Sequence, residues 1–402
     1  MSDVNSHIAA MSSVMSSVSS ESIRRTNRSD DASIACSAAA VLSQSTHPPT
    51  TLMQPIVAQL KPCLVTPEAG RVYYWCRCGR SANQPFCDGS HKGTGFEPMQ
   101  YVTLADGEEV LLCGCKQTRT PPFCDGTHTN LPGGSPLDDP YSEQNRAVPT
   151  VEARSDGRRI LNGGCYVLSP AAANMQIRGA LQYCAVISGD SGALYQAQFY
   201  LRLTAARSPV VACGERHAIL FVKAGRGSVI ISGRQFGIAP TDGVYIRPTE
   251  AFQLVADSGS TLEVFASACP LGDLEWLESM PMNFDAVFPV RIASVDPAQR
   301  KAMGPRYFQT LVDRRIGSDL ITQFIGHIPQ SKPAPHRHLY EEALIVLNGA
   351  GYMWTEDGKA DVRAGDVIFL PRKQSHSLQA TAADGMDVVG VIYPGDNPSI
   401  NY

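Results

Sequence analysis

The chain has 402 residues, of which 43% are hydrophobic and 18% charged, so it is long enough to form two or three domains with apolar cores. Its formal net charge of −4 comes from interspersed acids and bases, which predicts neither a nucleic-acid partner nor a membrane-surface partner. No apolar run reaches the roughly 18 residues that a transmembrane helix needs, so none is expected.

Residues 1–52 are rich in Ser and Ala and lack the basic start and apolar core of a signal peptide. Arg24, Arg25 and Arg28 are typical of a transit peptide, but neighbouring acids argue against one. We expect a disordered Ser-rich tail, the alternative being sequence upstream of a later start at Met53.

Residues 76–128 hold the same Cys and His pattern twice, with gaps of 2, 11 and 15 from the first Cys and a period of 37. The ligand candidates are Cys76, Cys78, Cys87 and His91 in the first copy, and Cys113, Cys115, Cys124 and His128 in the second. Soft thiolates with an imidazole select zinc, copper(I) or an iron–sulfur cluster. Disulfides are disfavoured because each copy contributes three thiols, and the thiol-rich pattern indicates a reducing cytoplasm.

Both copies share a Pro-Phe-Cys-Asp-Gly-(Ser/Thr)-His core, at Pro85–His91 and Pro122–His128, which resembles the CDGSH iron–sulfur family. The resemblance implies a tandem CDGSH domain over residues 53–129 with two [2Fe–2S] clusters, each held by three Cys and one His. A His ligand in place of Cys raises the cluster potential. The second copy departs in having Gln117-Thr118 where the first has Arg80-Ser81. Two small zinc sites remain the alternative.

Local patterns predict short strands that lead into each ligand loop. Val72–Trp75 is expected to be a strand, and residues 101–104 and 110–112 a hairpin around the Asp106-Gly107 turn. The Pro, Gly and charged residues of 130–157 predict a linker.

From residue 159 onward, short β-type runs separated by Gly, Pro and Asp-Gly predict an all-β sandwich or barrel. The clearest runs are Val210-Val211, Ala218–Val222, Ser228–Ile231, Val244–Ile246, Leu320–Phe324, Ala343–Leu347, Val367–Leu370 and Val388–Ile392. The expected fold class is therefore mainly β.

A second constellation lies in this β region. His336 and His338 alternate along a strand, so both imidazoles point to one face, and Glu342 keeps that parity. With His376 in a later hairpin, the stretch over about 288–394 resembles a cupin. The resemblance implies that these four residues hold one mononuclear divalent metal, with Fe(II) favoured over Mn(II), Ni(II) or Zn(II), and positions open for substrate. The alternative is a barrel with surface histidines and no metal.

Three neighbours are further candidates for catalytic roles. Glu341 should point away from the site unless a bulge exchanges it with Glu342. His327 is either a satisfied structural His or a residue near the barrel mouth that contacts substrate. Tyr340 is expected in the core or the pocket wall.

An earlier cupin-like copy is visible, because Lys223–Gly227 matches Leu347–Gly351 at a shift of 124. Its ligand positions fall on Ala212, Gly214, Ala218 and Gln253, so no metal is expected there, and His217 is interpreted as structural. The chain thus resembles a bicupin, a double-stranded β-helix in two copies, with a metal-free cupin over 158–282 and a metal-binding cupin over 283–402. One larger β-domain is the alternative.

These sites together predict that electrons pass within the chain, from the clusters to the cupin metal. The clusters would take electrons from a soluble donor, and the cupin metal would use them on a small-molecule substrate. The oligomeric state stays open, with a homo-oligomer as one alternative.

The fusion of tandem CDGSH repeats to a bicupin resembles the cupin–CDGSH metalloenzymes of diazeniumdiolate biosynthesis of the fragin and valdiazen type. That resemblance implies N–N bond formation, the N-nitrosation of an N-hydroxylated amine with a nitrogen-oxide unit such as nitrite. Two alternatives stay open: an O2-dependent cupin dioxygenase or oxidative decarboxylase, and a non-catalytic iron–sulfur redox sensor.

Overall fold

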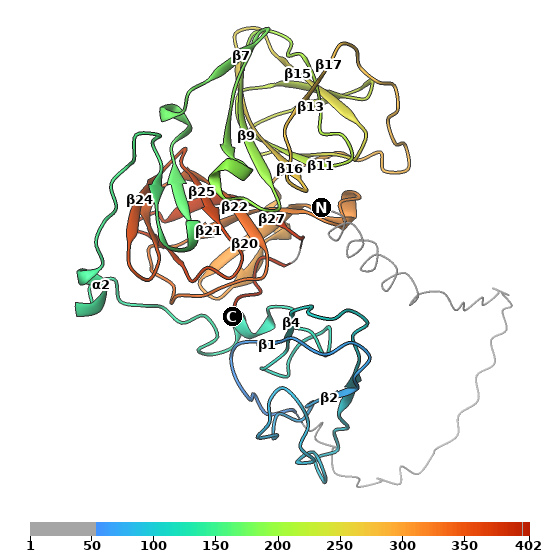
Figure 1. Cartoon of the computed structure of the whole chain (residues 1–402), viewed down its shortest axis with the longest axis vertical. Coiled ribbons are helices and arrows are strands. Elements are labelled where there is room, and N and C mark those ends of the chain that lie inside the picture. Colours follow the sequence, from blue (N-terminus) through green and yellow to red (C-terminus); the bar gives the residue numbers. More distant parts are fainter. Residues whose placement is uncertain (1–53, 396) are drawn as a thin grey trace, which may run out of the picture. The chain divides into compact units, whose positions relative to one another are not determined.

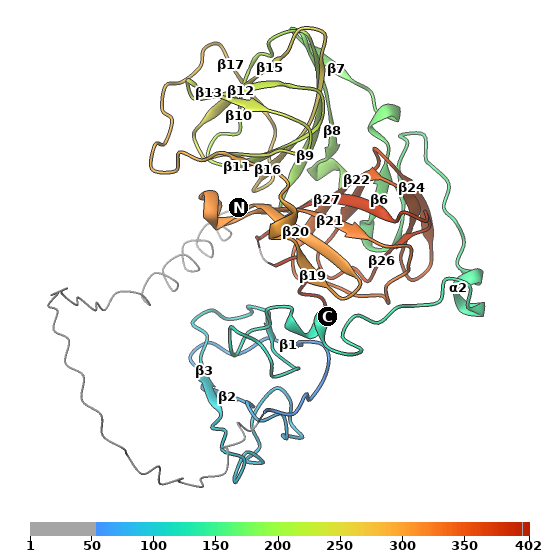
Figure 2. The same ribbon diagram turned by 180° about the vertical axis from the view of Figure 1, so that it is seen from behind.

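The computed structural model describes residues 54–395 and 397–402, so the Ser-rich tail expected over residues 1–52 lies outside the described residues. The described residues all belong to one compact unit, whose ribbon is drawn in Figure 1 and from behind in Figure 2. Strands are its main elements, which confirms a mainly β chain. None of the helices in the described ranges has the length and apolar character needed to cross a membrane.

The Cys-rich region contains two small antiparallel sheets, each built from one strand of each repeat. β1 (Cys63–Val65) pairs with β4 (Val110–Leu112), and β2 (Tyr73–Trp75) pairs with β3 (Met99–Tyr101). β1 and β2 belong to the first repeat, and β3 and β4 to the second. The two repeats therefore exchange strands and fold as one body.

This exchange shows that the hairpin expected over residues 101–112 is wrong, because β3 and β4 lie in different sheets. Asp106 accepts a hydrogen bond from the Ala69 N–H at 2.8 Å, so the predicted turn is tied to the first repeat. The strand expected over Val72–Trp75 is confirmed as β2.

The first barrel has a five-stranded sheet in the order β13-β12-β15-β10-β17 and a seven-stranded sheet in the order β18-β14-β11-β16-β9-β8-β7. Its strands are β7 (Gln176–Arg178), β8 (Leu181–Ile187), β9 (Ala197–Thr204), β10 (Val210–Ala212), β11 (His217–Ala224), β12 (Gly227–Ile231), β13 (Arg234–Ile238), β14 (Gly243–Ile246), β15 (Ala251–Ala256), β16 (Thr261–Cys269), β17 (Glu275–Leu277) and β18 (Ile292–Ala293).

The second barrel has an eight-stranded sheet in the order β19-β20-β21-β27-β22-β25-β6-β5 and a three-stranded sheet in the order β24-β23-β26. Its strands are β5 (Arg159–Ile160), β6 (Tyr166–Leu168), β19 (Lys301–Met303), β20 (Arg306–Val312), β21 (Thr322–Ile328), β22 (Glu341–Asn348), β23 (Ala350–Trp354), β24 (Lys359–Arg363), β25 (Val367–Leu370), β26 (Ser377–Ala380) and β27 (Met386–Tyr393). The order β14-β11-β16-β9-β8 recurs as β25-β22-β27-β21-β20, and β13-β12-β15 recurs as β24-β23-β26. The chain thus holds two copies of one β-barrel topology.

The helices of the described ranges are all short. They are η1 (Thr127–Asn130), α2 (Glu143–Ala147), η2 (Asn162–Gly164), η3 (Pro170–Ala172), η4 (Gly189–Ser191), η5 (Pro297–Gln299) and η6 (Arg314–Ile316).

Two matched glycines mark equivalent turns in the two barrels. Gly225, between β11 and β12, has φ +84°, and Gly349, between β22 and β23, has φ +79°. A Cβ at these positions would lie 2.2 Å from the Thr261 carbonyl oxygen and 2.3 Å from that of Gly385. Both turns therefore require glycine, which is why the repeat could be found from the sequence.

The sequence boundary between the barrels needs a correction. β6, from the segment assigned to the first barrel, pairs with β25 of the second, and β18, from beyond residue 282, pairs with β14 of the first. Each barrel therefore completes a sheet of the other. Such strand exchange leaves no local signal, because short edge strands read alike whichever sheet they join.

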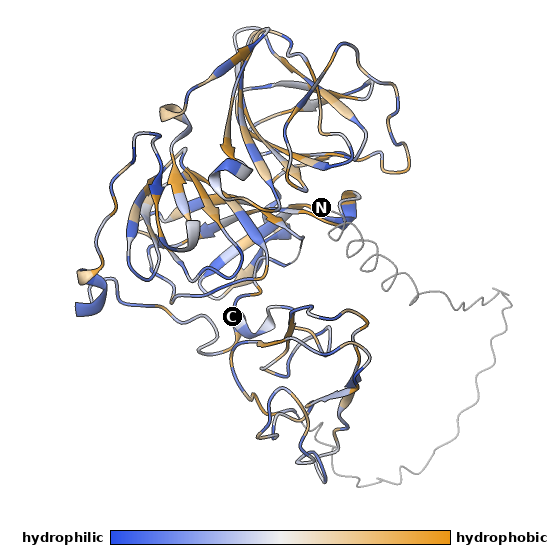
Figure 3. Ribbon diagram, in the orientation of Figure 1, coloured by the Kyte–Doolittle hydropathy of each residue, from blue (hydrophilic) through white to orange (hydrophobic). Residues whose placement is uncertain are grey.

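The two largest sheets face each other across an apolar layer. On β11, Leu220 and Val222 pack inside the first barrel, whereas Ile219 and Phe221 pack between the barrels. On β22 the same alternation places Leu344 inside the second barrel. Figure 3 shows apolar residues along the strands of both barrels. Along a strand that is buried on both faces, every second side chain therefore points into its own barrel, and the others point into the layer between the barrels.

The segment expected as a linker, 130–157, is attached to the second barrel. Leu137 forms a bridge with Pro333, and Asp138 forms an ion pair with Lys332. The Val151 N–H donates to the Lys359 carbonyl at 2.8 Å. These contacts hold the end of the Cys-rich region close to the second barrel.

A buried ion pair fixes the chain between the barrels. Arg291 is 0% exposed and Glu250 2% exposed, and Arg291 Nη2 lies 2.8 Å from Glu250 Oε1. The same carboxylate accepts the Asp285 N–H at 2.8 Å and the Arg247 N–H at 3.1 Å. The pair therefore ties the segment leading to β18 onto the first barrel.

We expect Glu250→Ala to lower the free energy of unfolding by about 3 to 5 kcal/mol, because it leaves the Arg291 guanidinium buried without a counter-ion. Urea denaturation followed by circular dichroism measures the change. The control is Glu275→Ala, which removes the more exposed pair with Arg216 and should cost under about 1 kcal/mol. Equal losses in the two variants would contradict the assignment.

Candidate cluster sites and metal centre

The ligand loops of the two repeats are closed by the same backbone hydrogen bonds. In the first repeat the Cys76 N–H donates to the Pro85 carbonyl at 2.8 Å, and the Cys87 N–H donates to the Tyr74 carbonyl at 2.7 Å. The second repeat makes both bonds 37 residues later, at 2.8 and 2.9 Å. The strands place both loops alike, so each repeat holds its group of four ligand candidates in a corresponding loop.

Within each group the ligand atoms form two pairs. Cys76 Sγ and Cys78 Sγ are 3.7 Å apart, and Cys87 Sγ is 3.1 Å from His91 Nδ1. In the second repeat Cys113 and Cys115 Sγ are 3.5 Å apart, and Cys124 Sγ is 3.5 Å from His128 Nδ1. Two sulfurs about 2.3 Å from one tetrahedral metal would be about 3.8 Å apart. Each pair thus has the spacing of two ligands on one ion.

The pairing bears on the choice between a cluster and a zinc ion. A single tetrahedral ion would draw all four ligand atoms together. Among the described residues, the one group of three or more ligand atoms that lie within 4.8 Å of one another is in the second barrel. Two separate pairs fit the two irons of a [2Fe–2S] cluster better than they fit one zinc ion.

An aspartate braces each loop. Asp88 Oδ1 accepts the Ser90 N–H at 2.9 Å and Oδ2 accepts the Ala82 N–H at 2.8 Å. Hydrogen bonds from Ser90 and Ala82 lower the pKa of Asp88 to about 2. Asp125 is also lowered to a pKa of about 2, because bonds from Thr127 and Arg119 outweigh the effect of burial. The Asp of each motif therefore holds the loop that carries the third Cys.

The two His ligands have different surroundings. The His91 side chain is 19% exposed, with Nε2 3.7 Å from Glu97 Oε2. His128 is 3% exposed and donates a hydrogen bond to the Asn401 backbone carbonyl. Burial lowers the pKa of His128, opposed by Asp125 and by that bond. One site thus opens to solvent and the other faces protein.

A buried lysine lies close to thiols of both repeats. Lys116 is 5% exposed, and its Nζ donates to the Cys113 carbonyl at 2.9 Å and lies 4.7 Å from the centre of the Trp75 ring. Burial lowers the pKa of Lys116, and the thiols of Cys76, Cys63 and Cys113 oppose that shift. The ammonium is therefore placed to balance the negative charge that clusters bring to this core.

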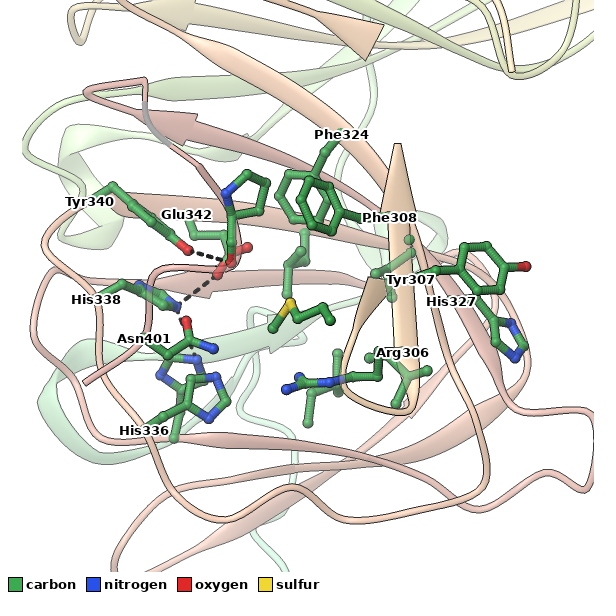
Figure 4. Close-up of a pocket in the computed structure, with 18 residues that line it drawn as sticks. Arg306, Tyr307, Phe308, Phe324, His327, His336, His338, Tyr340, Glu342 and Asn401 are labelled. Carbon is green, nitrogen blue, oxygen red and sulfur yellow. Dashed lines mark hydrogen bonds and ion pairs between the residues drawn. The ribbon is translucent and has the colours of Figure 1, made fainter. Parts of the chain in front are cut away.

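In the second barrel, three imidazoles converge. The ligand atoms of His336, His338 and His376 all lie within 4.8 Å of one another, and Nε2 of His338 is 3.2 Å from Nε2 of His376. Glu342 Oε2 is 3.1 Å from His338 Nε2, and Figure 4 shows this carboxylate pointing toward the imidazole. Two nitrogens bound about 2.1 Å from one metal would be about 3.0 to 3.4 Å apart, so the arrangement fits a divalent ion.

Backbone carbonyls orient two of these rings. His336 Nδ1 lies 3.1 Å from the Ala334 carbonyl and His376 Nδ1 lies 2.8 Å from the Gln374 carbonyl, so each Nε2 is free to face the site. Burial, with Arg306 and His338 nearby, lowers the pKa of His336 to about 3. Burial and the neighbouring imidazoles also lower the pKa of His376. Neutral imidazoles are the form that binds metal.

These ligands line a cavity of about 90 Å³, large enough for a small reactant. Most of its wall is apolar, and Met303, Phe308, Phe324, Leu344, Leu378 and Val388 contribute to it. Arg306 also lines it, and Figure 4 shows its guanidinium directed into the pocket. In the described part of the chain this guanidinium has no hydrogen bond or ion pair, so its charge is available to an anion.

Of the three further candidates, Tyr340 and His327 line the cavity and Glu341 does not. Tyr340 stacks on His338, with ring centres 4.2 Å apart. His327 Nδ1 lies 2.8 Å from Asp387 Oδ1, and its ring stacks on Tyr307. The interpretation of Tyr340 as pocket wall agrees with this placement.

Glu341 is corrected as a catalytic candidate. Its carboxylate faces the first barrel and accepts the backbone N–H groups of Leu194, Tyr195 and Gln196, at 3.0, 3.3 and 3.0 Å. No bulge exchanges it with Glu342, because both residues keep a regular register against β27. Glu341 therefore joins the barrels and does not reach the reaction site.

The corresponding region of the first barrel holds no ligand group among the described residues. Ala212 and Ala218 are packed in apolar clusters, and Gln253 donates to the Ser208 carbonyl at 2.7 Å. His217 Nδ1 lies 2.5 Å from the Tyr245 hydroxyl, which agrees with a structural role.

A second cavity, of about 310 Å³, adjoins a ligand of each site. It is lined by His128 of the second repeat and His336 of the metal centre, with Arg306 and Asn401 lining both cavities. Sequence reasoning missed Arg306 and Asn401, since neither lies in a ligand motif. Only the tertiary structure, in which both residues line the two cavities, reveals them.

The C-terminal segment 397–402 makes contacts on both sides. Asn397 Nδ2 donates to the Asp125 carbonyl at 2.9 Å in the second cluster loop. Tyr402 exchanges two backbone hydrogen bonds with Arg337, which lies between two metal-ligand candidates, each at 3.0 Å. This segment therefore connects the second cluster loop to residues 336–338. These residues form an isolated bridge between His336 and His376, so the strand expected there from the sequence is wrong.

Comparisons with known proteins match the first Cys-rich repeat and the second barrel. Residues 55–92 match the family described as iron-binding zinc finger CDGSH type, and residues 327–392 match the cupin domain. A mitochondrial CDGSH iron-sulfur domain-containing protein 3 of Mus musculus is 52% identical over 50 residues, covering 12% of this chain and 36% of that protein. The human protein of the same name is 48% identical over 55 residues, covering 13% of this chain and 43% of that protein. The match thus spans less than half the length of either curated relative.

Among solved structures, a single-residue variant of Bacillus subtilis oxalate decarboxylase aligns with a TM-score of 0.44 and 11% identity, over 57% of this chain and 77% of that chain. The Lactobacillus farciminis oxalate decarboxylase formate complex aligns with a TM-score of 0.45 and 14% identity, over 57% of this chain and 86% of that chain.

We expect each repeat to hold its own cluster. Cys87→Ser and Cys124→Ser should each remove about half of the cluster iron, because each breaks one ligand pair and leaves the other repeat intact. Iron and acid-labile sulfide analysis with visible absorption measures this on anaerobically purified protein. A buried non-ligand thiol supplies the control, and Cys184→Ser should keep full content. Loss of all iron from either variant would contradict two independent sites.

We expect the metal-free protein to lose stability as pH falls. The pKa of His336 is about 3 in the folded chain and about 6.5 when unfolded. At pH values between these two pKa values, the unfolded state therefore binds more protons than the folded state, so lowering the pH favours unfolding. The lowered pKa of His376 also makes the folded state less stable as pH falls. From pH 7 to 5, the metal-free protein should lose about 3 kcal/mol more than its His336→Gln/His376→Gln variant, measured by urea denaturation. Parallel pH profiles would show that these imidazoles are not held neutral.

Proposed function

We propose that this chain is a metal-dependent redox enzyme in which electrons pass from the second cluster site to the mononuclear centre. The supporting observation is that His128 and His336, one ligand candidate from each site, line the same cavity. Fusion in one chain keeps the electron source beside its acceptor at high effective concentration. A metal in the His and Glu cage would supply Lewis acidity and a change of oxidation state.

The residues around the metal-ligand candidates (His336, His338, His376 and Glu342) indicate which kind of reactant the pocket binds. Arg306 offers an unpaired guanidinium, which suits a small anion such as nitrite or a carboxylate held through two parallel hydrogen bonds. The aromatic and aliphatic wall, including Phe308 and Phe324, excludes water and packs against an apolar group. The pocket therefore favours two reactants, a small anion and a molecule with an apolar group.

Within this class we propose that the reaction joins two nitrogens, the N-nitrosation of an N-hydroxylated amine by nitrite. Nitrite taken up with a proton loses its hydroxyl as water, together with a proton from the amine. The N–O bond of nitrous acid breaks and an N–N bond forms, with no net oxidation. Arg306 would hold the anion in place, and electrons from the cluster would keep the centre in its active oxidation state.

The test supplies reconstituted protein with an N-hydroxylated amine, nitrite and reductant, and measures the N-nitroso product by mass spectrometry. We expect His336→Ala to abolish turnover while the cluster absorption persists. Arg306→Met should raise the KM for nitrite by about 10-fold or more, because it removes charge-assisted hydrogen bonds. Arg234→Met, on the exposed face of the first barrel, is the control and should turn over normally.

Absence of product from the reconstituted protein would overturn N–N bond formation. Strict O2 dependence with incorporation of oxygen atoms into the product would support a dioxygenase in its place. Cluster redox changes with no turnover of any kind would favour a sensor.

A further inference from the structure

The two cluster sites share their ligands but differ in the charge of the residues around them. Three positions next to ligands are basic in the first repeat and uncharged 37 residues later in the second. They are Arg77, Arg80 and Lys92, with Gly114, Gln117 and Thr129 as their counterparts.

The basic side chains of the first repeat are available at the surface. Arg77, Arg80 and Lys92 are all exposed. None of their side chains has a hydrogen bond or ion pair within the described ranges. By contrast, Arg119 of the second repeat is already paired with Asp125. The first repeat therefore carries three exposed basic side chains beside its ligand candidates, without an ion-pair partner in the described ranges.

Two acids also lie near the first site, and the side chain of one of them, Glu97, is 88% exposed. Asp88 accepts the backbone N–H groups of Ser90 and Ala82, and Glu97 lies beside His91. Each of the three basic residues is one or two positions from a ligand, so a partner that contacts them comes close to the cluster.

The different exposure of the two His ligand candidates indicates a direction of electron transfer, from the first repeat to the second. His91 reaches solvent, while His128 is buried against the cavity that also contacts His336. Electron transfer to an external protein needs a ligand near the surface, and transfer to the metal centre needs one near the second barrel. The repeats satisfy these two requirements separately.

We propose that the first repeat receives electrons from a small acidic electron-carrier protein, which docks against the exposed side chains of Arg77, Arg80 and Lys92 beside the ligand candidates. This inference rests on the proposed function, in which the second repeat delivers electrons to the metal. In each encounter the carrier loses one electron and the first site gains it, with no bond made or broken. Opposite charges on the two surfaces raise the rate of productive encounter.

The experiment uses a reduced acidic [2Fe–2S] ferredoxin as the probe and follows cluster bleaching by stopped-flow absorption. The test variant is Arg77→Gln/Arg80→Gln/Lys92→Gln in the full chain. We expect its second-order rate constant to fall by about 10-fold or more at low ionic strength, and the difference to shrink at high salt. Its affinity for the oxidised ferredoxin, measured by biolayer interferometry, should fall in parallel.

Two controls separate docking from other effects. Arg202→Gln/Arg226→Gln/Arg234→Gln removes the same charge from exposed positions of the first barrel and should leave the rate unchanged. Photoreduced 5-deazariboflavin, an uncharged reductant, should reduce all three proteins equally. A test variant that ferredoxin reduces at the wild-type rate would overturn the proposal, as would equal slowing of both triple variants.

The same measurement in a His336→Ala background distinguishes this inference from the proposed function. If the metal centre has another role, carrier docking at the first repeat still shows the charge dependence. If the chain with His336 intact shows no charge dependence of reduction by ferredoxin but turns over with the uncharged reductant, only the route of electron supply is overturned.

Discussion

The burial of β22 on both faces is the constraint on which the rest of the second barrel depends. Because the strand lies between two packed layers, alternate side chains have opposite destinations. Glu342 points into the barrel and reaches His338 at 3.1 Å, whereas Glu341 accepts three backbone N–H groups from the first barrel. Two adjacent carboxylates thus face the candidate metal centre and the contact between the barrels without competing. A shift of one residue in register would exchange them and lose both.

The first barrel, in which the described residues form no group of metal ligands, has a clear structural purpose in this arrangement. It provides the apolar layer against which β22 is packed, the backbone donors that satisfy Glu341, and a partner for strand exchange. A buried carboxylate with no such donors would be costly. The copy that lacks ligand residues therefore still supports the copy that has them.

The two cluster sites illustrate how one motif acquires two roles through its surroundings. Their ligand spacing, loop hydrogen bonds and bracing aspartates are the same, so the chemistry at the ligands is alike. What differs is the environment: exposed basic residues at the first site, and the segment 397–402 with the second barrel at the other. Accessibility and electrostatics, rather than ligand identity, separate electron uptake from delivery in our proposal.

The sequence alone determined the ligands, since thiolates and imidazoles at fixed spacing are needed for metal binding whatever the fold around them. It also determined the strand runs and the turns at Gly225 and Gly349, because periodicity and positive φ are local requirements. Only the tertiary structure decided the pairing of β1 with β4, the exchange of β6 and β18, and the position of Arg306 beside the metal cage. These features join residues distant in sequence, and edge strands or a lone arginine carry no local mark of the partner they will meet.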